Sequence, residues 1–352
     1  MTLQEAINSI KPLDEKAMEY TRWRWNTLGK PLHSLGRLEK MVTRIAGIYR
    51  DKDPHIGKRA VIVMAADNGV VEEGVTQTGQ EVTKIVTENM TKHNATICIL
   101  SGISGADVYP VDIGIVTDCD NPGVMSRKVR YGTANMLKEP AMTREEAIKA
   151  IETGIDIVGE LVEKGYTMFA TGEMGIGNTT TSSAICAALL NQSVEKVTGK
   201  GAGLTSQGLE RKIEVIKESL KVNQVDPSDP LDVLHKVGGL DIAGLVGCFI
   251  GGAVYHVPVF VDGFISSVAA LLATRIAPAC KPYIFPSHCS DEPAGRMVLD
   301  AMDMRPYILA DMCLGEGTGA VIGFTIADYA FKAYWELPSF EKTAFGTYEE
   351  LE

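Results

Sequence analysis

The sequence predicts an α/β fold in which a parallel sheet is flanked by helices. Short, continuous apolar runs recur along the chain and end in Asp, Asn or Gly, which is typical of strands buried on both faces. Segments with helical periodicity separate these runs, as in βαβ units. Hydrophobic residues make up 45% of the 352 residues and charged residues 22%. These ordinary globular proportions argue against a disordered chain, a coiled coil or a fibrous repeat.

The amino-terminal segment, residues 3–50, is predicted to be helical. Its apolar residues follow helical spacing, and the stretch Leu28-Gly29-Lys30-Pro31 interrupts the pattern. Residues 330–352 are also helical or irregular in pattern. We therefore expect residues 1–55 and 330–352 to form a small helical domain from both chain ends. Residues 56–329 are expected to form a large α/β catalytic domain.

Predicted strands lie at 60–66, 107–113, 166–171, 258–262 and, more weakly, 282–285. The clearest helix between them covers 143–164, because Thr143 and Glu146 form a capping box at its start and Gly165 ends it. Ligands of parallel sheets bind beyond the carboxyl ends of the strands. Polar and glycine-rich segments follow the predicted strands at 67–80, 172–181 and 262–263, so we expect the functional site there.

The net charge and the cysteines restrict the class of protein. Lys and Arg number 34 against 45 Asp and Glu, and the resulting net charge of −11 argues against a broad surface for nucleic acid. The seven cysteines are scattered without a C-x-x-C pair. This pattern predicts reduced thiols, a cytoplasmic location, and neither disulfides nor a zinc site. The six histidines form no H-x-x-x-H pair, which argues against a metal centre.

No membrane span and no secretion signal are expected. The most apolar stretch, 240–261, is interrupted by Asp241, His256 and Pro258, so it is predicted to be a buried helix that leads into a strand. The amino terminus alternates charged and apolar residues and lacks the apolar core of a signal peptide.

The segment 171–181 carries the strongest indication of a ligand. It follows a predicted strand, is rich in glycine and opens a helix, so its backbone can approach a ligand closely. The N–H groups of the first helical turn, together with the hydroxyls of residues 179–181, would bind a phosphate. The spacing matches neither a Walker motif nor G-x-G-x-x-G, and a tight turn without a ligand is the alternative. Glu173 would repel a phosphate and suits a ribose hydroxyl better.

Two further segments could contribute to a site. Glycines at 199–203 precede a helix with the adjacent cations Arg211 and Lys212, which could contact a phosphate or belong to an ordinary exposed helix start. In 314–320, glycines on both sides of Glu316 let a ligand approach its carboxylate. Partial burial would raise the pKa of that carboxylate and suit it to be a general base. The alternative is a glycine-rich helix start in which Glu316 interacts with the helix dipole.

A nucleophilic triad is a further hypothesis. Asp262 ends a predicted strand, and the segment 287–292 offers hydroxyls, carboxylates and His288. The spacing permits a Ser-His-Asp arrangement, but the chain has no G-x-S-x-G motif. A hydrogen-bonded structural role for His288 is the alternative.

Taken in order, the motifs resemble those of the nicotinate-nucleotide:dimethylbenzimidazole phosphoribosyltransferases, which make the α-ribotide of the cobalamin lower ligand. Each motif is weak alone, whereas the ordered set is specific and covers nearly the whole chain. The matching motifs are Lys30-Pro31-x-x-Ser34-Leu-Gly-Arg-Leu-Glu39, Asp67-x-Gly69-Val70, Gly172-Glu-Met-Gly-Ile-Gly-Asn-Thr-Thr180, Val237-Gly-Gly, Asp262-Gly-Phe, Ser287-His-x-Ser290 and Leu314-Gly-Glu-Gly-Thr-Gly-Ala320.

The resemblance implies a large domain with a Rossmann-like parallel sheet, a small domain from both chain ends, and a homodimer or a heterodimer with a paralogue. It also implies a reaction in which an aromatic acceptor displaces nicotinate from nicotinate mononucleotide. Glu316 would take the acceptor's proton, and one-step displacement would invert the β-nucleotide to the α-ribotide. Because the pyridinium is already a good leaving group, neither a metal nor a cofactor is expected.

The same resemblance assigns the remaining site residues. Phosphate-binding positions are matched by Gly175, Gly177, Asn178, Thr179, Thr180, Gly201 and Lys212. Positions near the ribose and nicotinate are matched by Glu173, Gly263 and Ser290. Thr78 and Leu314 match the wall of the acceptor pocket. Since Ser290 takes this other role, the triad hypothesis is dropped.

Three positions depart from the family pattern. Members often have Pro-Gly where this chain has Leu32-His33, and often His where it has Asn68. Val86 occupies a position near the acceptor ring at which family members can carry Gln. Without the amide, an azole nitrogen loses a hydrogen-bond partner and the wall becomes more apolar. We expect a dimethylbenzimidazole-type azole as the acceptor, with phenol or p-cresol as the alternative.

Two other classes of function remain in competition at this point. A nicotinamide-dependent oxidoreductase would use the same strand, loop and helix, but the sequence lacks a convincing dinucleotide fingerprint. A catalytically silent subunit that binds nucleotide and supports a paralogue is the other class. The presence of Glu316 argues against a silent subunit.

Overall fold

One six-stranded sheet forms the centre of the protein, and all its strands run parallel. In the computed structural model, which describes residues 1–343, 346 and 348, the strand order is β3-β2-β1-β4-β5-β6. The strands are β1 (Lys58–Ala66), β2 (Ala106–Gly114), β3 (Met125–Ser126), β4 (Tyr166–Met174), β5 (Val259–Val261) and β6 (Ile284–Pro286). The predicted α/β fold with a parallel sheet is confirmed.

The central strands explain the continuous apolar runs of the sequence. Residues 60–66 of β1 are fully buried, because helices cover the sheet on both sides. Strand β3 was not predicted, since its two residues carry no recognisable pattern. Strand β4 continues to Met174, beyond the predicted end at 171, so Gly172 and Glu173 belong to the strand and not to the loop after it.

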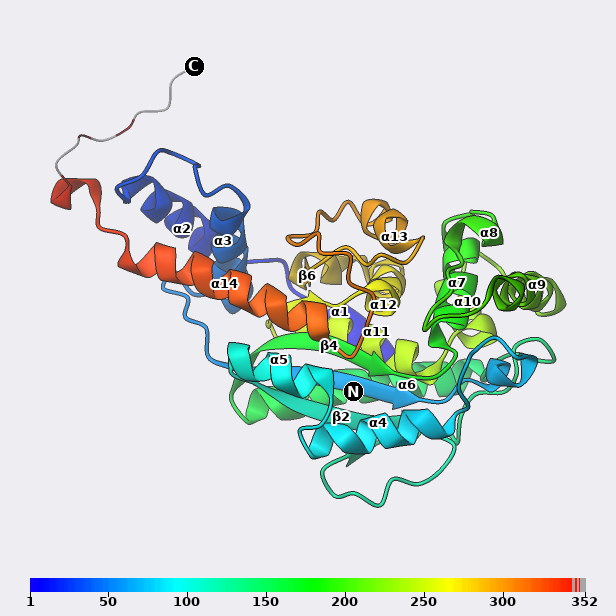
Figure 1. The fold of residues 1–352 in the computed structure, drawn as a ribbon. Helices are drawn as coiled ribbons and strands as arrows, with labels where there is room; N and C mark the ends of the chain where they lie inside the picture. Colours follow the sequence, from blue (N-terminus) through cyan, green and yellow to red (C-terminus); the bar gives the residue numbers. More distant parts are fainter. Residues whose placement is uncertain (344–345, 347, 349–352) are drawn as a thin grey trace.

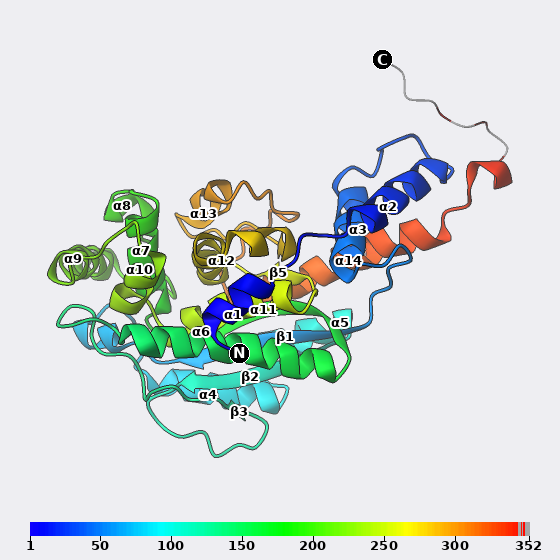
Figure 2. The same cartoon turned by 180° about the vertical axis from the view of Figure 1, so that it is seen from behind.

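Helices cover the two faces of the sheet (Figures 1 and 2). One face carries α4 (Glu81–Thr91), α5 (Thr96–Ser104) and α14 (Thr318–Glu336). The other carries α6 (Arg144–Glu163), α11 (Leu240–Val254) and α12 (Phe264–Ile276). The capping box predicted for α6 is present, with Thr143 and Glu146 each bonded to the other's backbone N–H. Helices α6 and α11 approach closely, because a Cβ on Gly247 would lie 2.0 Å from the carbonyl oxygen of Ile151.

A second group of helices lies beyond the sheet on the side of the glycine-rich segments, in green at the right of Figure 1. It consists of α7 (Asn178–Leu189), α8 (Val194–Val197), α9 (Ser206–Val222) and α10 (Pro230–Val237). Helix α7 contacts each of the other three, and α13 (Gly295–Ala301) packs on α12. Three short 3₁₀ turns complete the described elements: η1 (Gly69–Glu73), η2 (Pro278–Tyr283) and η3 (Phe340–Lys342).

The helices of the chain ends pack in two places. Helices α2 (Glu15–Thr27) and α3 (Arg37–Tyr49) pack on each other, and α3 packs on α14. Helix α1 (Leu3–Ser9) instead contacts α6 and α11. Helix α14 passes through the predicted boundary at residue 330, and residues 344, 345, 347 and 349–352 of that segment lie outside the described residues. The division into two domains stays a prediction.

The motif around Lys30 has a structural explanation in this region. Its ammonium lies 2.8 Å from Oε1 of Glu39, and both side chains are buried. The same oxygen accepts a hydrogen bond from the backbone N–H of Leu35 at 3.0 Å. The motif therefore fixes the turn that precedes α3.

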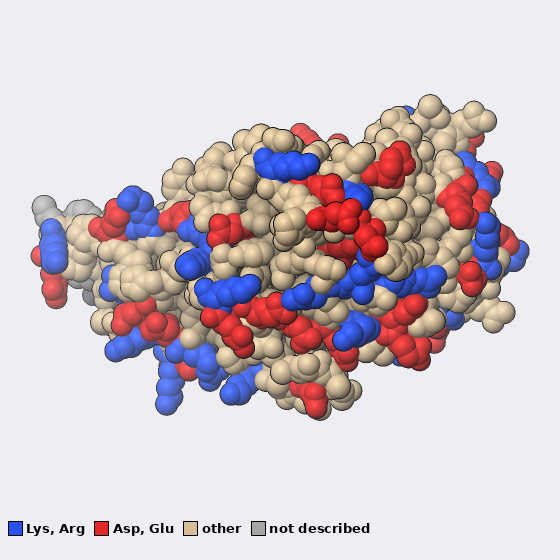
Figure 3. Space-filling model, turned by 90° about the horizontal axis from the view of Figure 1, so that it is seen from below, with Lys and Arg blue, Asp and Glu red and all other residues tan. Residues whose placement is uncertain are grey.

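Charges are mixed on the surface seen from below the view of Figure 1. Figure 3 shows Lys and Arg side chains interspersed with Asp and Glu, so this face carries no broad basic region.

No disulfide joins any of the seven cysteines. Within the described part of the chain, no helix is both long enough and apolar enough to cross a membrane.

Candidate active site

A cavity of about 550 Å³ opens beyond the ends of β4 and β5, where the sequence predicts the functional site. Its walls come from segments that are far apart in the chain. The predicted site residues that line it are Thr78, Val86, Glu173, Gly175, Gly177, Asn178, Thr179, Gly201, Gly263, Ser290, Leu314 and Glu316. Lys212 and Thr180 do not line the cavity.

Lys212 lies directly behind one end of the cavity. Its ammonium donates to Oγ1 of Thr179 at 2.8 Å and to the carbonyl oxygen of Gly199 at 3.2 Å. The side chain is almost completely buried, and this burial lowers the pKa of Lys212 to about 8. A Cβ on Gly201 would lie 2.8 Å from the Thr179 hydroxyl, so the glycine lets the two loops meet. A cation and a hydroxyl therefore converge at the start of α7.

The first turn of α7 offers fewer groups than the sequence predicts. The N–H groups of Asn178 and Thr180 already donate to the carbonyls of Gly175 and Gly177. The Thr180 hydroxyl is buried without a hydrogen-bond partner among the described residues. Of the three consecutive threonines, only Thr179 reaches the cavity.

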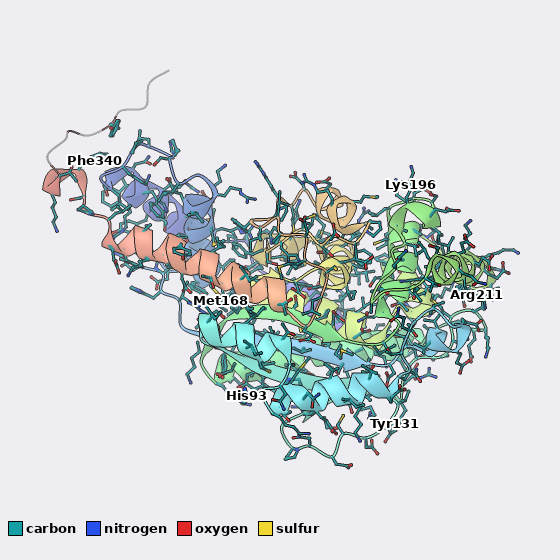
Figure 4. All side chains as sticks on the ribbon, viewed as in Figure 1. His93, Tyr131, Met168, Lys196, Arg211 and Phe340 are labelled. Atoms are coloured by element: carbon teal, nitrogen blue, oxygen red, sulfur yellow. The ribbon has the colours of Figure 1, made fainter. Side chains whose placement is uncertain are left out.

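Arg211, adjacent in sequence to Lys212, points away from this site. Figure 4 shows it at the outer edge of α9. Its guanidinium pairs with Glu73 at 2.6 Å. The two adjacent cations of the sequence thus have different surroundings, and only Lys212 can serve the cavity.

Glu316 is held in an uncommon backbone conformation at the start of α14. Gly315, Glu316 and Gly317 have φ of +92°, +61° and +95°. Positive φ is uncommon for a non-glycine residue and costs it energy. The loop lies directly on β4, because a Cβ on Gly172 would be 2.4 Å from the Glu316 carbonyl oxygen.

Asp262 fixes the start of α14 from another part of the chain. Its carboxylate accepts hydrogen bonds from the N–H groups of Gly317 at 3.0 Å, Gly319 at 2.8 Å and Ala320 at 3.2 Å. It therefore caps the helix in place of a Ser, Thr or Asp at the cap position itself. The Glu316 side chain is left free of that task.

The Glu316 carboxylate reaches the start of another helix. Its Oε2 accepts a hydrogen bond from the backbone N–H of Ile97, at the first turn of α5, at 3.2 Å. Burial is the main cause that raises the pKa of Glu316 above the usual range, and the neighbouring Asp262 carboxylate raises it further. A carboxylate whose pKa is raised toward neutrality is suited to accept a proton.

Glu173 belongs to a buried group of polar side chains. The amide Nδ2 of Asn178 donates to Oε2 of Glu173 and, at 3.0 Å, to Oδ2 of Asp241. Burial raises the pKa of Glu173 to about 8, and the Asp241 carboxylate contributes to this rise. Gly315 is required beside it, because a Cβ there would lie 2.3 Å from Oε1 of Glu173.

The geometry offers no nucleophilic triad. The Ser290 hydroxyl accepts from the N–H of Glu292 at 3.3 Å, and Nδ1 of His288 lies 3.2 Å from the hydroxyl of Ser287. The His288 ring packs against α14, where a Cβ on Gly319 would be 1.8 Å from Nδ1. His288 lines the cavity and interacts electrostatically with Asp262, but Ser287, whose hydroxyl it contacts, is completely buried outside the cavity and donates to the carbonyl oxygen of Val261. This group therefore offers no accessible nucleophile, in agreement with dropping the triad.

The remaining wall of the cavity is largely apolar. Val86 on α4 and Leu314 line it together with Val75, Ile176 and Phe264. Thr78 is positioned by its carbonyl, which accepts from the Thr76 hydroxyl at 2.8 Å. No group of three or more potential metal ligands occurs within the described part of the chain.

Some residues of the site were not predicted. In the sequence, Asp241 stands out only as an interruption of an apolar run, although a lone carboxylate in a buried helix is itself an indication of a site. Asp262 ends a predicted strand, but its capping contact is long-range and invisible in the sequence. Gln77 lines the cavity, and its amide donates to the carbonyl oxygen of Gly203, which also lines it. No feature of the sequence marks Gln77 as a site residue.

Comparisons with known proteins point to one family. A family model described as "Phosphoribosyltransferase" matches residues 10–344. The nicotinate-nucleotide–dimethylbenzimidazole phosphoribosyltransferase of Ruminiclostridium cellulolyticum is 51% identical over 352 residues, which is 100% of each chain. That of Acetivibrio thermocellus is 47% identical and covers 99% of each chain.

A solved structure shares the fold as well. The crystal structure of the nicotinate-nucleotide–dimethylbenzimidazole phosphoribosyltransferase from Thermus thermophilus aligns with a TM-score of 0.87 at 37% identity, covering 94% of this chain and 98% of that one. Full-length identity at this level, together with the family model, establishes the relationship. The chain belongs to the nicotinate-nucleotide–dimethylbenzimidazole phosphoribosyltransferase family.

Proposed function

We propose that this enzyme transfers the 5-phosphoribosyl group of nicotinate mononucleotide to a dimethylbenzimidazole-type acceptor, giving the α-ribotide and nicotinate for cobamide synthesis. The observation that carries this proposal is the Glu316 carboxylate, which faces the same cavity as Thr179, the residue to which the buried Lys212 donates from behind. A phosphate held at one end would place the ribose between these groups and Glu316. The relatives are named for the same pair of substrates, a nicotinate nucleotide and dimethylbenzimidazole.

The reaction follows from the chemistry of the substrates. The acceptor nitrogen attacks the anomeric carbon, and the bond from that carbon to the pyridinium nitrogen breaks. The electron pair of that bond stays on nicotinate and neutralises the ring. Glu316 accepts the N–H proton of the acceptor, which would otherwise leave a cationic product. Attack from the face opposite the leaving group inverts the β-nucleotide to the α-ribotide.

The phosphate is bound at the start of α7 in this proposal. Lys212 supplies the charge, and the Thr179 hydroxyl with the N–H groups of the glycine-rich segment supplies further donors. Gly201 belongs to the same end, whereas Glu173, Gly263 and Ser290 would contact the ribose and nicotinate. Thr78, Val86 and Leu314 would contact the acceptor ring.

The acceptor is proposed to be an azole. The curated relatives carry dimethylbenzimidazole in their names, and nothing in the comparisons supports a phenol. Nicotinate release measured with dimethylbenzimidazole, adenine, phenol and p-cresol, with mass spectrometry of each product, tests this assignment. Reaction of the phenols without reaction of the azoles would overturn it.

Replacement of Glu316 tests the assigned base. Glu316→Gln keeps the size of the side chain but cannot take a proton, so transfer is expected to fall at least about 10²-fold. Glu139→Gln, at an exposed position outside the cavity, is the matched control and should keep full activity. Equal melting temperatures would show that both variants fold. Wild-type turnover of Glu316→Gln would remove the proposed role.

The assembly and location are proposed from the surface and the cysteines. A homodimer is supported by Ile99 and Ile103, one turn apart on α5 and both exposed, beside the exposed Tyr329 of the adjacent α14. Sedimentation of the purified chain distinguishes this dimer from a chain that needs a paralogue.

A cytoplasmic location is supported by the seven unpaired cysteines.

A further inference from the structure

Two buried carboxylates share one amide group at the base of the cavity. Asn178 Nδ2 donates to Glu173 on β4 and to Asp241 on α11. Both acidic side chains are more than nine-tenths buried. One neutral amide is little compensation for two negative charges removed from water.

Several oxygen atoms around this pair lack a donor. Oδ1 of Asp241 is buried with no hydrogen-bond partner among the described residues, and so is Oδ1 of Asn68. Both oxygens face Gly239, where a Cβ would lie 2.4 Å from the first and 2.6 Å from the second. Among the same residues, Oε1 of Glu173 accepts no hydrogen bond, although Glu173 lines the cavity. Unpartnered acceptors of this kind are satisfied by a proton on one of the carboxyl groups.

The charges that face the pair are also negative. Asp262, after β5, and Glu316, before α14, raise the pKa of Glu173, and Asp67 at the end of β1 raises that of Asp241. Burial is the larger cause in both cases and brings the pKa of Asp241 to about 6 and that of Glu173 to about 8. Two interacting carboxyl groups in such surroundings titrate as one unit, and at neutral pH the unit retains a proton.

The location of Glu173 relates this proton to the substrate. Asn178, to which Glu173 is bonded, is the first residue of α7 at the phosphate end. On the other side, Oε1 of Glu173 faces Gly315, next to Glu316. A nicotinate mononucleotide whose phosphoribosyl group spans from α7 to Glu316 therefore places its pyridinium nitrogen and anomeric carbon beside Glu173.

We propose that the Glu173–Asp241 pair, bridged by Asn178, holds one proton in the ligand-free enzyme and releases it to solvent when a pyridinium nucleotide binds, so that the pair becomes the site's recognition element for positive charge. Asp241 acts through Asn178 and is a positioning residue. This inference rests on the proposed function and deepens it. The cationic ring takes the place of the released proton as the positive charge that neutralises the pair.

The proton balance also favours binding of the substrate over binding of the products. Transfer breaks the bond to the pyridinium, whose positive charge disappears as nicotinate forms. The acceptor's own proton passes to Glu316, so neither product carries a ring cation. The pair then takes a proton back from solvent, and the charge complementarity that favoured the substrate is absent for both products.

Calorimetry in buffers of different ionisation enthalpy measures the released proton directly. Nicotinate mononucleotide binding at about pH 7, without acceptor, is expected to release close to one proton per site more than binding of uridine monophosphate, which has the same phosphate and ribose but carries neither the pyridinium charge nor the carboxylate on its base. Its affinity relative to the uridine nucleotide should increase with pH, by up to about tenfold per unit, until the free pair is ionised. Equal proton release by both nucleotides would overturn the inference and leave the proposed function standing.

Variants identify the source of the proton. Glu173→Gln and Asp241→Asn should each reduce the release to that of the neutral nucleotide, whereas Glu316→Gln, which removes another carboxyl with a raised pKa, should retain it. Release that persists in both Glu173→Gln and Asp241→Asn would overturn the assignment. If Asp241→Asn does not fold, infrared difference spectra of the wild type decide, because nucleotide binding must remove a protonated-carboxyl band. Absence of binding by nicotinate mononucleotide would instead contradict the proposed function.

Discussion

Lys212 is almost completely buried, and its ammonium donates to two neutral oxygens instead of a carboxylate. Such a charge is unfavourable in the ligand-free protein, as the lowered pKa indicates. In the ligand-free protein the Glu292 carboxylate is the negative charge that favours the charged form of Lys212, and a bound phosphate would add a second. At the scale of single residues, the site is therefore built from ionisable groups whose surroundings suit the complex better than the free enzyme.

Lys212→Met should separate binding from stability. Removal of charge-assisted hydrogen bonds to the phosphate, each worth about 1.5–3 kcal/mol, is expected to raise KM for nicotinate mononucleotide by roughly 10- to 100-fold. The melting temperature of the ligand-free variant should equal or exceed that of the wild type, because a buried charge is replaced by an apolar chain. Arg211→Met, at the neighbouring surface position, serves as the control and should leave KM unchanged. An unaltered KM in Lys212→Met would contradict the phosphate assignment.

Val86→Gln tests whether this position selects the acceptor. An amide on the cavity wall can hydrogen-bond an azole nitrogen, and such a bond contributes about 0.5–1.5 kcal/mol. We expect the ratio of kcat/KM for dimethylbenzimidazole to that for p-cresol to increase by about 3- to 10-fold. Val86→Leu, which stays apolar, should not change the ratio. An unchanged ratio with Gln would show that position 86 does not face the acceptor ring.

Single residues differ in how well the sequence predicts them. Glu316 could be predicted because glycines on both sides of a carboxylate are unusual at a helix start. Thr180 could not be separated from Thr179, because the direction of each hydroxyl depends on where β4 ends and α7 begins. Asp241 was missed since its partners Asn178 and Glu173 come from other segments of the chain, and only the folded protein brings them together.

At the scale of elements, the start of α14 depends on a cap from outside the helix. Three N–H groups of residues 317–320 donate to the single carboxylate of Asp262. Local sequence predicts helices that cap themselves, as α6 does with Thr143 and Glu146, and that prediction is confirmed. It cannot predict a cap that arrives from the end of β5, because no spacing rule relates positions so far apart.

Asp262→Ala should affect both stability and catalysis. Loss of the cap leaves three buried N–H groups without an acceptor, at a cost of about 1 kcal/mol or more each, so the free energy of unfolding should fall by roughly 3 kcal/mol. Glu316 lies beside this cap, so kcat should fall as well. Thr143→Ala removes the cap of α6, far from the cavity, and should cost about 1 kcal/mol with kcat unchanged. Both effects are read from thermal denaturation and steady-state rates.

If Asp262→Ala and Thr143→Ala changed kcat equally, the loss of activity would reflect general destabilisation and not the position of Glu316. If Asp262→Ala left the unfolding free energy unchanged, the three hydrogen bonds would not contribute to stability. The control thus distinguishes a cap that serves the site from one that serves the fold alone.

At the scale of the whole molecule, buried acids give folding a characteristic dependence on pH. In the folded state the pKa of Asp241 is about 6 and that of Glu173 about 8, both above the values in the unfolded chain. The folded state therefore binds more protons than the unfolded state at pH values between the unfolded and the folded pKa of each group. The resulting stabilisation is complete at low pH and is lost as the pH rises through these values.

We expect the free energy of unfolding of the ligand-free protein to fall between about pH 4 and about pH 8, by up to about 1.4 kcal/mol per pH unit for each titrating group, and the melting temperature to fall with it. Glu173→Gln should reduce this decrease, because glutamine stays neutral throughout. Melting curves at constant ionic strength, compared between variant and wild type, isolate the contribution of Glu173 from all other groups. The same pH dependence in both proteins would show that folding does not raise the pKa of Glu173.

Helix α14 relates the base to the far end of the molecule. It begins beside Glu316 and, 19 residues later, ends among α2 and α3, where the rings of Trp25 and Tyr334 lie 5.0 Å apart. At about 1.5 Å per residue it is about 28 Å long, so a tilt of about 5° about its distal end displaces its start by about 2.5 Å. Misplacement of a catalytic group by about 1 Å can cost about 10²-fold in rate. The contacts at the remote end of the helix therefore help to set the position of Glu316. Mutations in those aromatic contacts should be expected among the ones that impair turnover without touching the substrates.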